Sequence, residues 1–134
     1  MSLKDEERQL LVKLYLTKSD ETLEDARFCC SQGRWNATAN RLYYALFHAI
    51  TALFVSDGIP VASHNGMKVR FGKEYVLTGL ATDEEGKLLS QMETMRERAD
   101  YDATFMATKA IIDERFESVE RMIQHIKELA TRDR

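Results

Sequence analysis

Glycine and proline are scarce in this sequence. It has 6 glycines and 1 proline among 134 residues, well below the share of roughly 12% in average proteins. Folds with many tight turns, such as β-sandwiches and barrels, depend on these two residues. The scarcity therefore favours long helices. Because a chain of this length leaves no room for two ordinary cores, we expect one domain over residues 1–134.

Paired cysteine motifs, basic blocks and long apolar runs are also missing. The 2 cysteines, Cys29 and Cys30, are adjacent, so the sequence predicts neither a disulfide framework nor a zinc site. The net charge is −3, and no basic block could bind nucleic acid non-specifically. The longest apolar run, residues 42–55, contains His48 and is short for a membrane span. Residues 4–8 are charged where a secretory signal would be apolar. We therefore expect a cytoplasmic protein without membrane contact.

Hydrophobic periodicity predicts helices throughout and no strand. Gly33 is a natural C-terminal stop for the first helix, and Thr82 with Glu85 forms a capping-box pattern at the start of the fourth. The expected fold class is all-α, an up-and-down helical bundle of four long helices plus one short helix. The expected ranges are 6–32, 34–56, about 64–77, 82–101 and about 105–131.

The sequence offers no metal-binding or cofactor-binding motif. A di-metal site in a helical bundle needs inward Glu-x-x-His pairs, but no glutamate lies three residues before His48, His64 or His125. Glycine-rich phosphate loops and the GxSxG and HExxH motifs are absent as well. We therefore expect no metal and no cofactor. His125 is predicted to be a solvated residue, because it lies far from the apolar stripe of its helix.

The second predicted helix is apolar on almost every side but keeps one polar stripe. At 100° per residue, Arg41, Tyr44 and His48 share a face with Asn40 and Thr51. Arg41 and His48 lie about 10.5 Å apart along the axis, so one extended ligand could touch both without direct contact between them. A permanently charged guanidinium beside an imidazole that titrates near neutrality suits phosphodiester chemistry. The histidine would transfer a proton, and the arginine would stabilise phosphate charge.

A structural role for these polar residues is the alternative. Arg41 could pair with a carboxylate from another helix, and His48 could be a hydrogen-bonded core or interface residue. The end of the fourth predicted helix has two interpretations as well. Arg96 and Asp100 are spaced to pair at a solvated helix end, or Arg96 and Tyr101 could line a groove.

Several motifs, in this order, resemble the HEPN domain family. They are NRLYYALFHA at residues 40–49, Gly58, SHNG at residues 63–66 and RADY at residues 98–101. The chain is most similar to small stand-alone HEPN proteins with YYAxFHA and RxxADY elements, over about residues 10–130. The resemblance implies an all-α bundle, frequently a homodimer. It also implies a neighbouring nucleotidyltransferase-type partner in a toxin–antitoxin or defence pair.

The same resemblance implies a chemistry. Active members of the wider family are metal-independent ribonucleases whose arginine and histidine are separated by four to six residues, with two copies facing each other across a dimer. Arg41 and His48 satisfy this spacing, although the family's motif usually belongs to a later helix. In the later element here, Tyr101 follows Arg96 at the position where the family has histidine. Tyrosine, with an ordinary pKa near 10, is a poor general base at neutral pH.

Three hypotheses of function follow. In the first, the chain is the RNA- or nucleotide-associated component of a two-component system and a metal-independent endoribonuclease with Arg41 and His48 as catalytic residues. In the second, it is a non-catalytic module that dimerises or binds a nucleotidyltransferase-type partner. In the third, it is a helical nucleotide-binding domain. The residues expected to shape the groove or bind nucleotide are Tyr44, Arg96, Asp100 and Tyr101.

Overall fold

Five α-helices build the fold. The computed structural model describes residues 3–60 and 63–133, and within them it contains no strand. The prediction of an all-α bundle of four long helices and one short helix is confirmed. None of the described helices is long and apolar enough to cross a membrane. The helices are α1 (Leu3–Ser31), α2 (Trp35–Asp57), α3 (His64–Phe71), α4 (Asp83–Tyr101) and α5 (Lys109–Ala130), with a π-helical turn η1 (Gly72–Val76) after α3.

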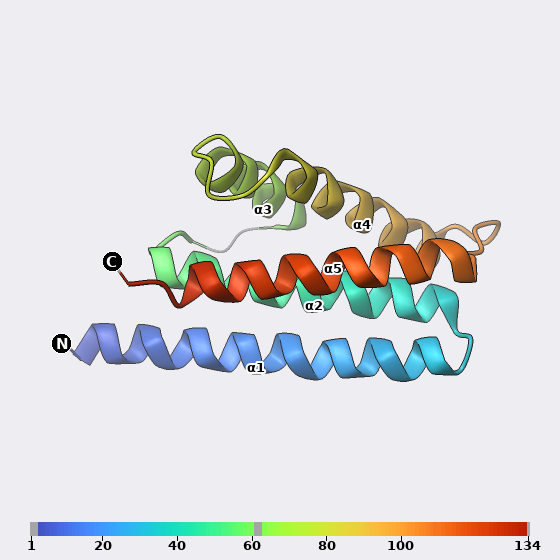
Figure 1. The fold of residues 1–134 in the computed structure, drawn as a ribbon, viewed down its shortest axis with the longest axis horizontal. Helices are drawn as coiled ribbons and strands as arrows, with labels where there is room; N and C mark the ends of the chain where they lie inside the picture. The colour runs from blue at the N-terminus through green and yellow to red at the C-terminus, as the bar shows by residue number, and fades with distance from the viewer. Residues whose placement is uncertain (1–2, 61–62, 134) are drawn as a thin grey trace.

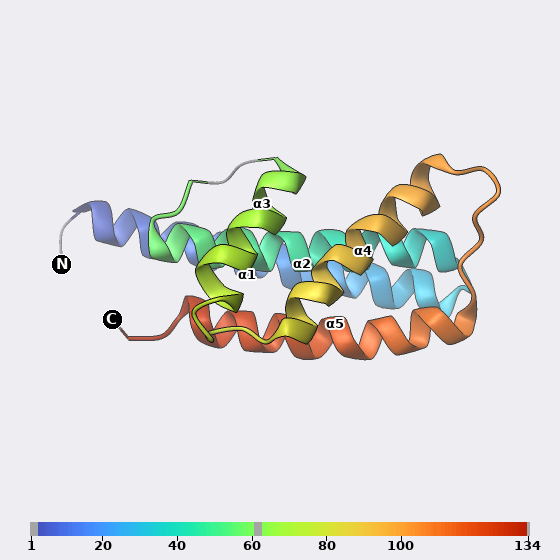
Figure 2. The same ribbon diagram turned by 90° about the horizontal axis from the view of Figure 1, so that it is seen from above.

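The helix α2 lies at the centre of the bundle. Figure 1 shows α1 on one side of α2, α5 beside it, and α3 and α4 on the side away from α1. Seen from above in Figure 2, α4 runs obliquely across the long helices. Because α1, α4 and α5 all pack on α2, most of its apolar side chains are buried, and each fully buried large one contributes about 1.5–3 kcal/mol. The fully buried large ones are Leu42, Tyr43, Leu46, Ile50, Leu53 and Phe54.

Most helix ends follow the local sequence signals. The capping box is present, since the Thr82 hydroxyl accepts from the Glu85 N–H while the Glu85 carboxylate accepts from the Thr82 N–H. Gly33 ends α1 with φ 69°. The fifth helix begins at Lys109 rather than near residue 105, because the Thr108 hydroxyl caps it by accepting from the Ile111 N–H.

A buried hydrogen bond joins α1 to α2 where they cross. Ser19 is completely buried, and its hydroxyl donates to the carbonyl oxygen of Ala45 at 2.7 Å. Ala26, Ala45 and Ala49 are also fully buried. Small side chains on both helices leave room for the close packing of α1 on α2.

His125 is not simply solvated. Its side chain is 35% exposed, and its Nδ1 lies 2.7 Å from Oε2 of Glu85. Glu85 therefore caps α4 with one carboxylate oxygen and contacts α5 with the other. The prediction of a solvated His125 is wrong, because it considered only the apolar stripe of α5 and not the start of α4 beside it.

Candidate functional site

Tyr44 on α2 is the centre of a cluster of cations and rings. The guanidinium carbons of Arg41 and Arg96 lie 5.5 Å and 5.7 Å from its ring centroid. The ring of His48 lies 6.4 Å from it, centroid to centroid. Arg41, Tyr44 and His48 come from one face of α2, whereas Arg96 reaches the ring from α4. We call these four residues the Tyr44 cluster.

Arg41 is tied to α4 through an amide rather than through a carboxylate. Its Nε donates to Oδ1 of Asn40 at 2.9 Å, and the Asn40 amide donates to both carboxylate oxygens of Asp100 at 3.2 Å and 3.1 Å. Within the described residues, no carboxylate lies at ion-pair distance from Arg41, and its two terminal nitrogens make no hydrogen bond. These nitrogens are available to an anionic ligand, since Arg41 is only partly buried.

Arg96 does not belong to a solvated helix end. It is only 5% exposed, and its guanidinium packs against the rings of both Tyr43, at 5.2 Å, and Tyr44. Its distance to Oδ2 of Asp100 is 3.7 Å, too long for a hydrogen bond. The predicted pairing of Arg96 with Asp100 is thus present as an ion pair, but the guanidinium that makes it is buried and does not lie at a solvated helix end. The two rings cover the guanidinium from α2, and their negative faces stabilise it in place of water.

His48 is a partly exposed imidazole with a lowered pKa. Burial lowers its pKa below the ordinary value, and the positive charges of Lys18 and Arg41 lower it further. The imidazole is therefore neutral at pH 7, the form that a general base requires. It is partly exposed, and in the part of the chain that the structure describes its ring nitrogens make no hydrogen bond. As the spacing predicts, Tyr44 separates it from Arg41.

Tyr101 lies outside the Tyr44 cluster. Its side chain is 81% exposed, at the edge of a hollow of about 370 Å³. Arg96 lines the same hollow, so it reaches both the cluster and the groove, whereas Arg41, Tyr44 and His48 do not line it. The lining residues are Arg96, Glu97, Arg98, Tyr101 and Asp102.

The structure places three further residues beside the Tyr44 cluster, namely Tyr43, Phe47 and His64, to which the sequence analysis gave no role. The His64 ring, at the start of α3, lies 4.8 Å from the Phe47 ring and 5.9 Å from the Tyr44 ring. Its Nδ1 is 2.7 Å from the hydroxyl of buried Tyr43. Ser63 caps α3 by accepting from the backbone of Gly66, which sets where His64 begins the helix. The sequence signal that could have pointed to His64 is the helix-capping Ser63 directly before it.

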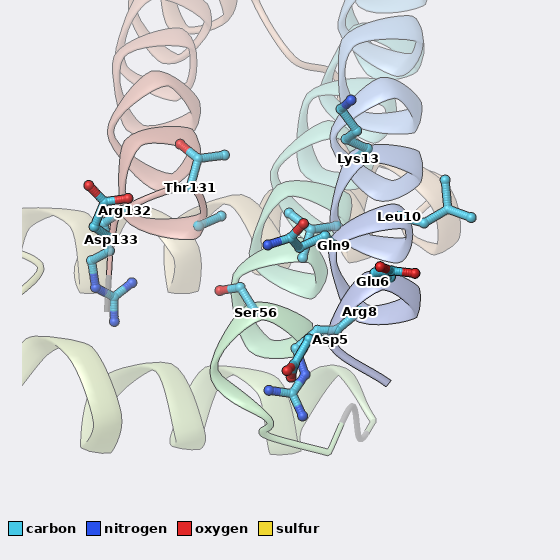
Figure 3. Close-up of a pocket in the computed structure, with 12 residues that line it drawn as sticks. Asp5, Glu6, Arg8, Gln9, Leu10, Lys13, Ser56, Thr131, Arg132 and Asp133 are labelled. Atoms are coloured by element: carbon cyan, nitrogen blue, oxygen red, sulfur yellow. The ribbon is translucent and has the colours of Figure 1, made fainter. Parts of the chain in front are cut away.

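A larger hollow at the other end of the bundle contains none of the predicted residues. It measures about 800 Å³ and lies between the start of α1 and the end of α5 (Figure 3). Its lining mixes acidic Asp5 with basic Arg8 and Lys13, and the Ser56 hydroxyl is already bonded to the Leu53 carbonyl. Because charges of both signs surround it and no imidazole or thiol lines it, we assign it no chemistry. Among the residues the structure describes, no group of three or more His, Cys, Asp or Glu could hold a metal ion.

Known proteins resemble this chain over most of its length. A UPF0332 protein of Thermotoga maritima is 32% identical, over 71% of this chain and 72% of its own. Two proteins of Methanocaldococcus jannaschii that carry the name "Putative toxin" are each 27% identical. One alignment covers 70% of this chain and 64% of the relative, and the other covers 92% of both. The model of the HEPN domain matches residues 12–129, a span that contains all of α2, α3 and α4. This chain belongs to the HEPN domain family.

Proposed function

We propose that this protein is the toxin-like component of a two-component system and cleaves RNA without a metal ion. The observation that carries the proposal is the pairing of Arg41 and His48 across Tyr44. Arg41 offers terminal guanidinium nitrogens that make no hydrogen bond in the described structure, and His48 offers a neutral imidazole. Both side chains are partly exposed. Membership of the HEPN family and the toxin names of two relatives support it.

The proposed reaction is an internal phosphoryl transfer. His48 accepts the proton of a ribose 2′-hydroxyl, whose oxygen attacks the adjacent phosphorus while the bond to the 5′-oxygen breaks. The products are a 2′,3′-cyclic phosphate and a strand with a 5′-hydroxyl, once the leaving oxygen takes up a proton. Arg41 stabilises the charge that develops on the non-bridging phosphate oxygens.

The remaining predicted residues position this pair. Asp100 holds the Asn40 amide, which holds the Nε of Arg41. Arg96 packs on the Tyr44 ring from α4, and Arg41 and His48 both lie beside that same ring. The exposed ring of Tyr101 offers a surface on which a base can stack, as aromatic rings do in single-stranded nucleic-acid sites.

We further propose that the active form is a homodimer. Leu10, Leu11 and Leu14 on α1 are 57%, 44% and 57% exposed, an apolar stripe that water would disfavour. Lys18 lies one turn beyond Leu14 and acts electrostatically on His48. A second copy seated on this stripe would therefore border the Tyr44 cluster and shield it from solvent.

Cleavage of RNA in the presence of a chelator tests the proposal. Purified protein is incubated in EDTA with unfractionated tRNA and with an unstructured oligoribonucleotide, and products are examined for 2′,3′-cyclic phosphate ends. We expect His48→Gln to lower the rate by about 10²-fold or more. His125→Gln is the matched control, because it removes an imidazole remote from the cluster. Equal rates for the wild type and His48→Gln would remove His48 from the mechanism.

The second candidate is a non-catalytic module that binds a nucleotidyltransferase-type partner. The observation in its favour is the exposure of two large side chains, Tyr101 at 81% and Met106 at 82%, at the end of α4 and in the link to α5. This function predicts no RNA cleavage by the wild type. It also predicts that Tyr101→Ala weakens association with the partner without lowering the melting temperature.

A third candidate, nucleotide binding alone, depends on the free nitrogens of Arg41 or on Arg96 in its hollow. Calorimetry with ATP, GTP and their monophosphates tests it. No heat of binding for any of them would dismiss this candidate.

A further inference from the structure

Two imidazoles flank the same pair of aromatic rings. The His48 ring lies 5.9 Å from the Phe47 ring and 6.4 Å from the Tyr44 ring. The His64 ring, which comes from α3, lies 4.8 Å and 5.9 Å from the same two rings. All four side chains are partly exposed. The two imidazoles therefore lie beside the same two rings, His48 from α2 and His64 from α3.

The hydroxyl of Tyr43 holds the His64 ring in place. It lies 2.7 Å from Nδ1 of His64, and Tyr43 itself is 1% exposed and cannot shift toward solvent. Burial raises the pKa of the Tyr43 phenol, as does the negative charge of Glu93, so the phenol keeps its proton at any physiological pH.

A phenol can either donate or accept a hydrogen bond. The hydroxyl can donate to Nδ1 when the imidazole is neutral and accept from Nδ1–H when it is charged. The contact therefore survives both protonation states, while Nε2 is left to gain or lose a proton. The charged groups near the Tyr43–His64 pair each have a partner of opposite charge, since Lys68 lies beside Glu93 and Arg96 beside Asp100. Lys68 on α3 lies 3.5 Å from Glu93 on α4, and Arg96 on α4 packs on the Tyr43 ring.

We propose that His64 is a second catalytic residue, the general acid that protonates the leaving 5′-oxygen of RNA. This inference rests on the proposed RNA cleavage. His48 takes the proton from the 2′-hydroxyl, the 2′-oxygen bonds to phosphorus, and the bond from phosphorus to the 5′-oxygen breaks as that oxygen takes the Nε2 proton of His64. One proton is accepted and one is donated, so no external acid or base is consumed. His48 and His64 exchange their protonation states in each turnover and return to the starting state through solvent.

Changing the leaving group tests whether His48 acts as the base and His64 as the acid. An oligonucleotide with a single ribonucleotide, at a site that the wild type cuts, is made with either oxygen or sulfur at the bridging 5′ position. A thiolate leaves without protonation, so a general acid is not needed for the sulfur substrate. His64→Asn serves as the variant, because its amide can still bond the Tyr43 hydroxyl near the former Nδ1 position while the titratable group is gone.

We expect His64→Asn to cut the oxygen substrate about 10²-fold more slowly than the wild type. It should cut the sulfur substrate within a few-fold of the wild-type rate. His48→Gln should be slow on both substrates, because the 2′-hydroxyl needs a base in either case.

Other results overturn the inference. If His64→Asn slows both substrates equally, or slows neither, His64 is not the acid. A lowered melting temperature with equal losses on both substrates would assign it a purely structural role. If the wild type cuts neither substrate, the proposed RNA cleavage is wrong, and the proposed role of His64 is wrong as well. The wild-type reactions thus separate failure of the proposed function from failure of this inference.

Discussion

The guanidinium of Arg96 on α4 packs against the ring of Tyr43 on α2, with 5.2 Å between the guanidinium carbon and the ring centroid. Both side chains are buried, with exposed fractions of 5% and 1%. A cation–π contact that is shielded from water contributes about 2 kcal/mol. The contact fastens α4 to the central helix and supports Tyr44 at the same time. The candidate site thus depends on the packing that stabilises the fold.

Replacing Arg96 should destabilise the protein far more than replacing an exposed arginine. We expect Arg96→Ala to lower the free energy of unfolding by about 2–4 kcal/mol, because it removes the contacts with Tyr43 and Tyr44 and leaves a cavity. Arg121→Ala is the matched control, since the Arg121 side chain is 69% exposed and surface changes stay within about 0.5 kcal/mol. Urea unfolding followed by circular dichroism measures both. Equal effects would contradict the structural importance of Arg96.

The Asn40–Asp100 contact should behave as one unit. Asn40 is partly buried and donates to a charged acceptor, and such hydrogen bonds contribute about 1.5–3 kcal/mol. We expect Asn40→Ala and Asp100→Ala each to lower the free energy of unfolding. The double variant should lose less than the two single losses together. A double-mutant cycle in urea measures the coupling, and strictly additive losses would show that the two residues do not interact.

Stability should fall as the pH drops through the range where His48 titrates. Its pKa in the folded protein lies below the ordinary value of about 6.5, so the unfolded chain binds the proton first as the pH decreases. Stability therefore rises with pH in this range. We expect the urea midpoint of the wild type to decrease from about pH 7.5 to pH 5.5 more steeply than that of His48→Gln. Parallel curves for the two proteins would contradict a perturbed His48.

The dimer proposal predicts that a charge among the exposed leucines of α1 disrupts the dimer. Multi-angle light scattering should give the wild type twice the monomer mass of 15.5 kDa. Leu14→Glu places a charge in the exposed apolar stripe and should shift the protein to the monomer. Leu77→Glu is the control, because Leu77 is 82% exposed but lies outside α1. A wild type that is monomeric at every concentration tested, or a Leu14→Glu variant that stays dimeric, would exclude this interface.

Local sequence signals predicted the helices well, but they did not predict features that depend on contacts with distant parts of the chain. Gly33 and the Thr82–Glu85 box mark helix ends where the structure has them, because caps act within four residues. The π-helical turn after Phe71 was not predicted. Nothing in the residues of that segment distinguishes a π turn from the end of an ordinary helix. It places Tyr75 so that its hydroxyl donates to Asp57, a contact between residues far apart in the chain.

The sequence by itself determined the helical class, the nearly all-round apolar character of α2 and the shared face of Arg41, Tyr44 and His48. These follow from composition and from the 3.6-residue period, which operate within one segment. Only the tertiary structure decided that Arg96 is buried against Tyr43 and Tyr44, that Arg41 is held through Asn40, and that His64 lies beside the same rings as His48. Those contacts join different helices, and their geometry depends on how α3 and α4 cross α2. Crossing angles are set by the packing of whole surfaces, which the periodicity of a single helix does not contain.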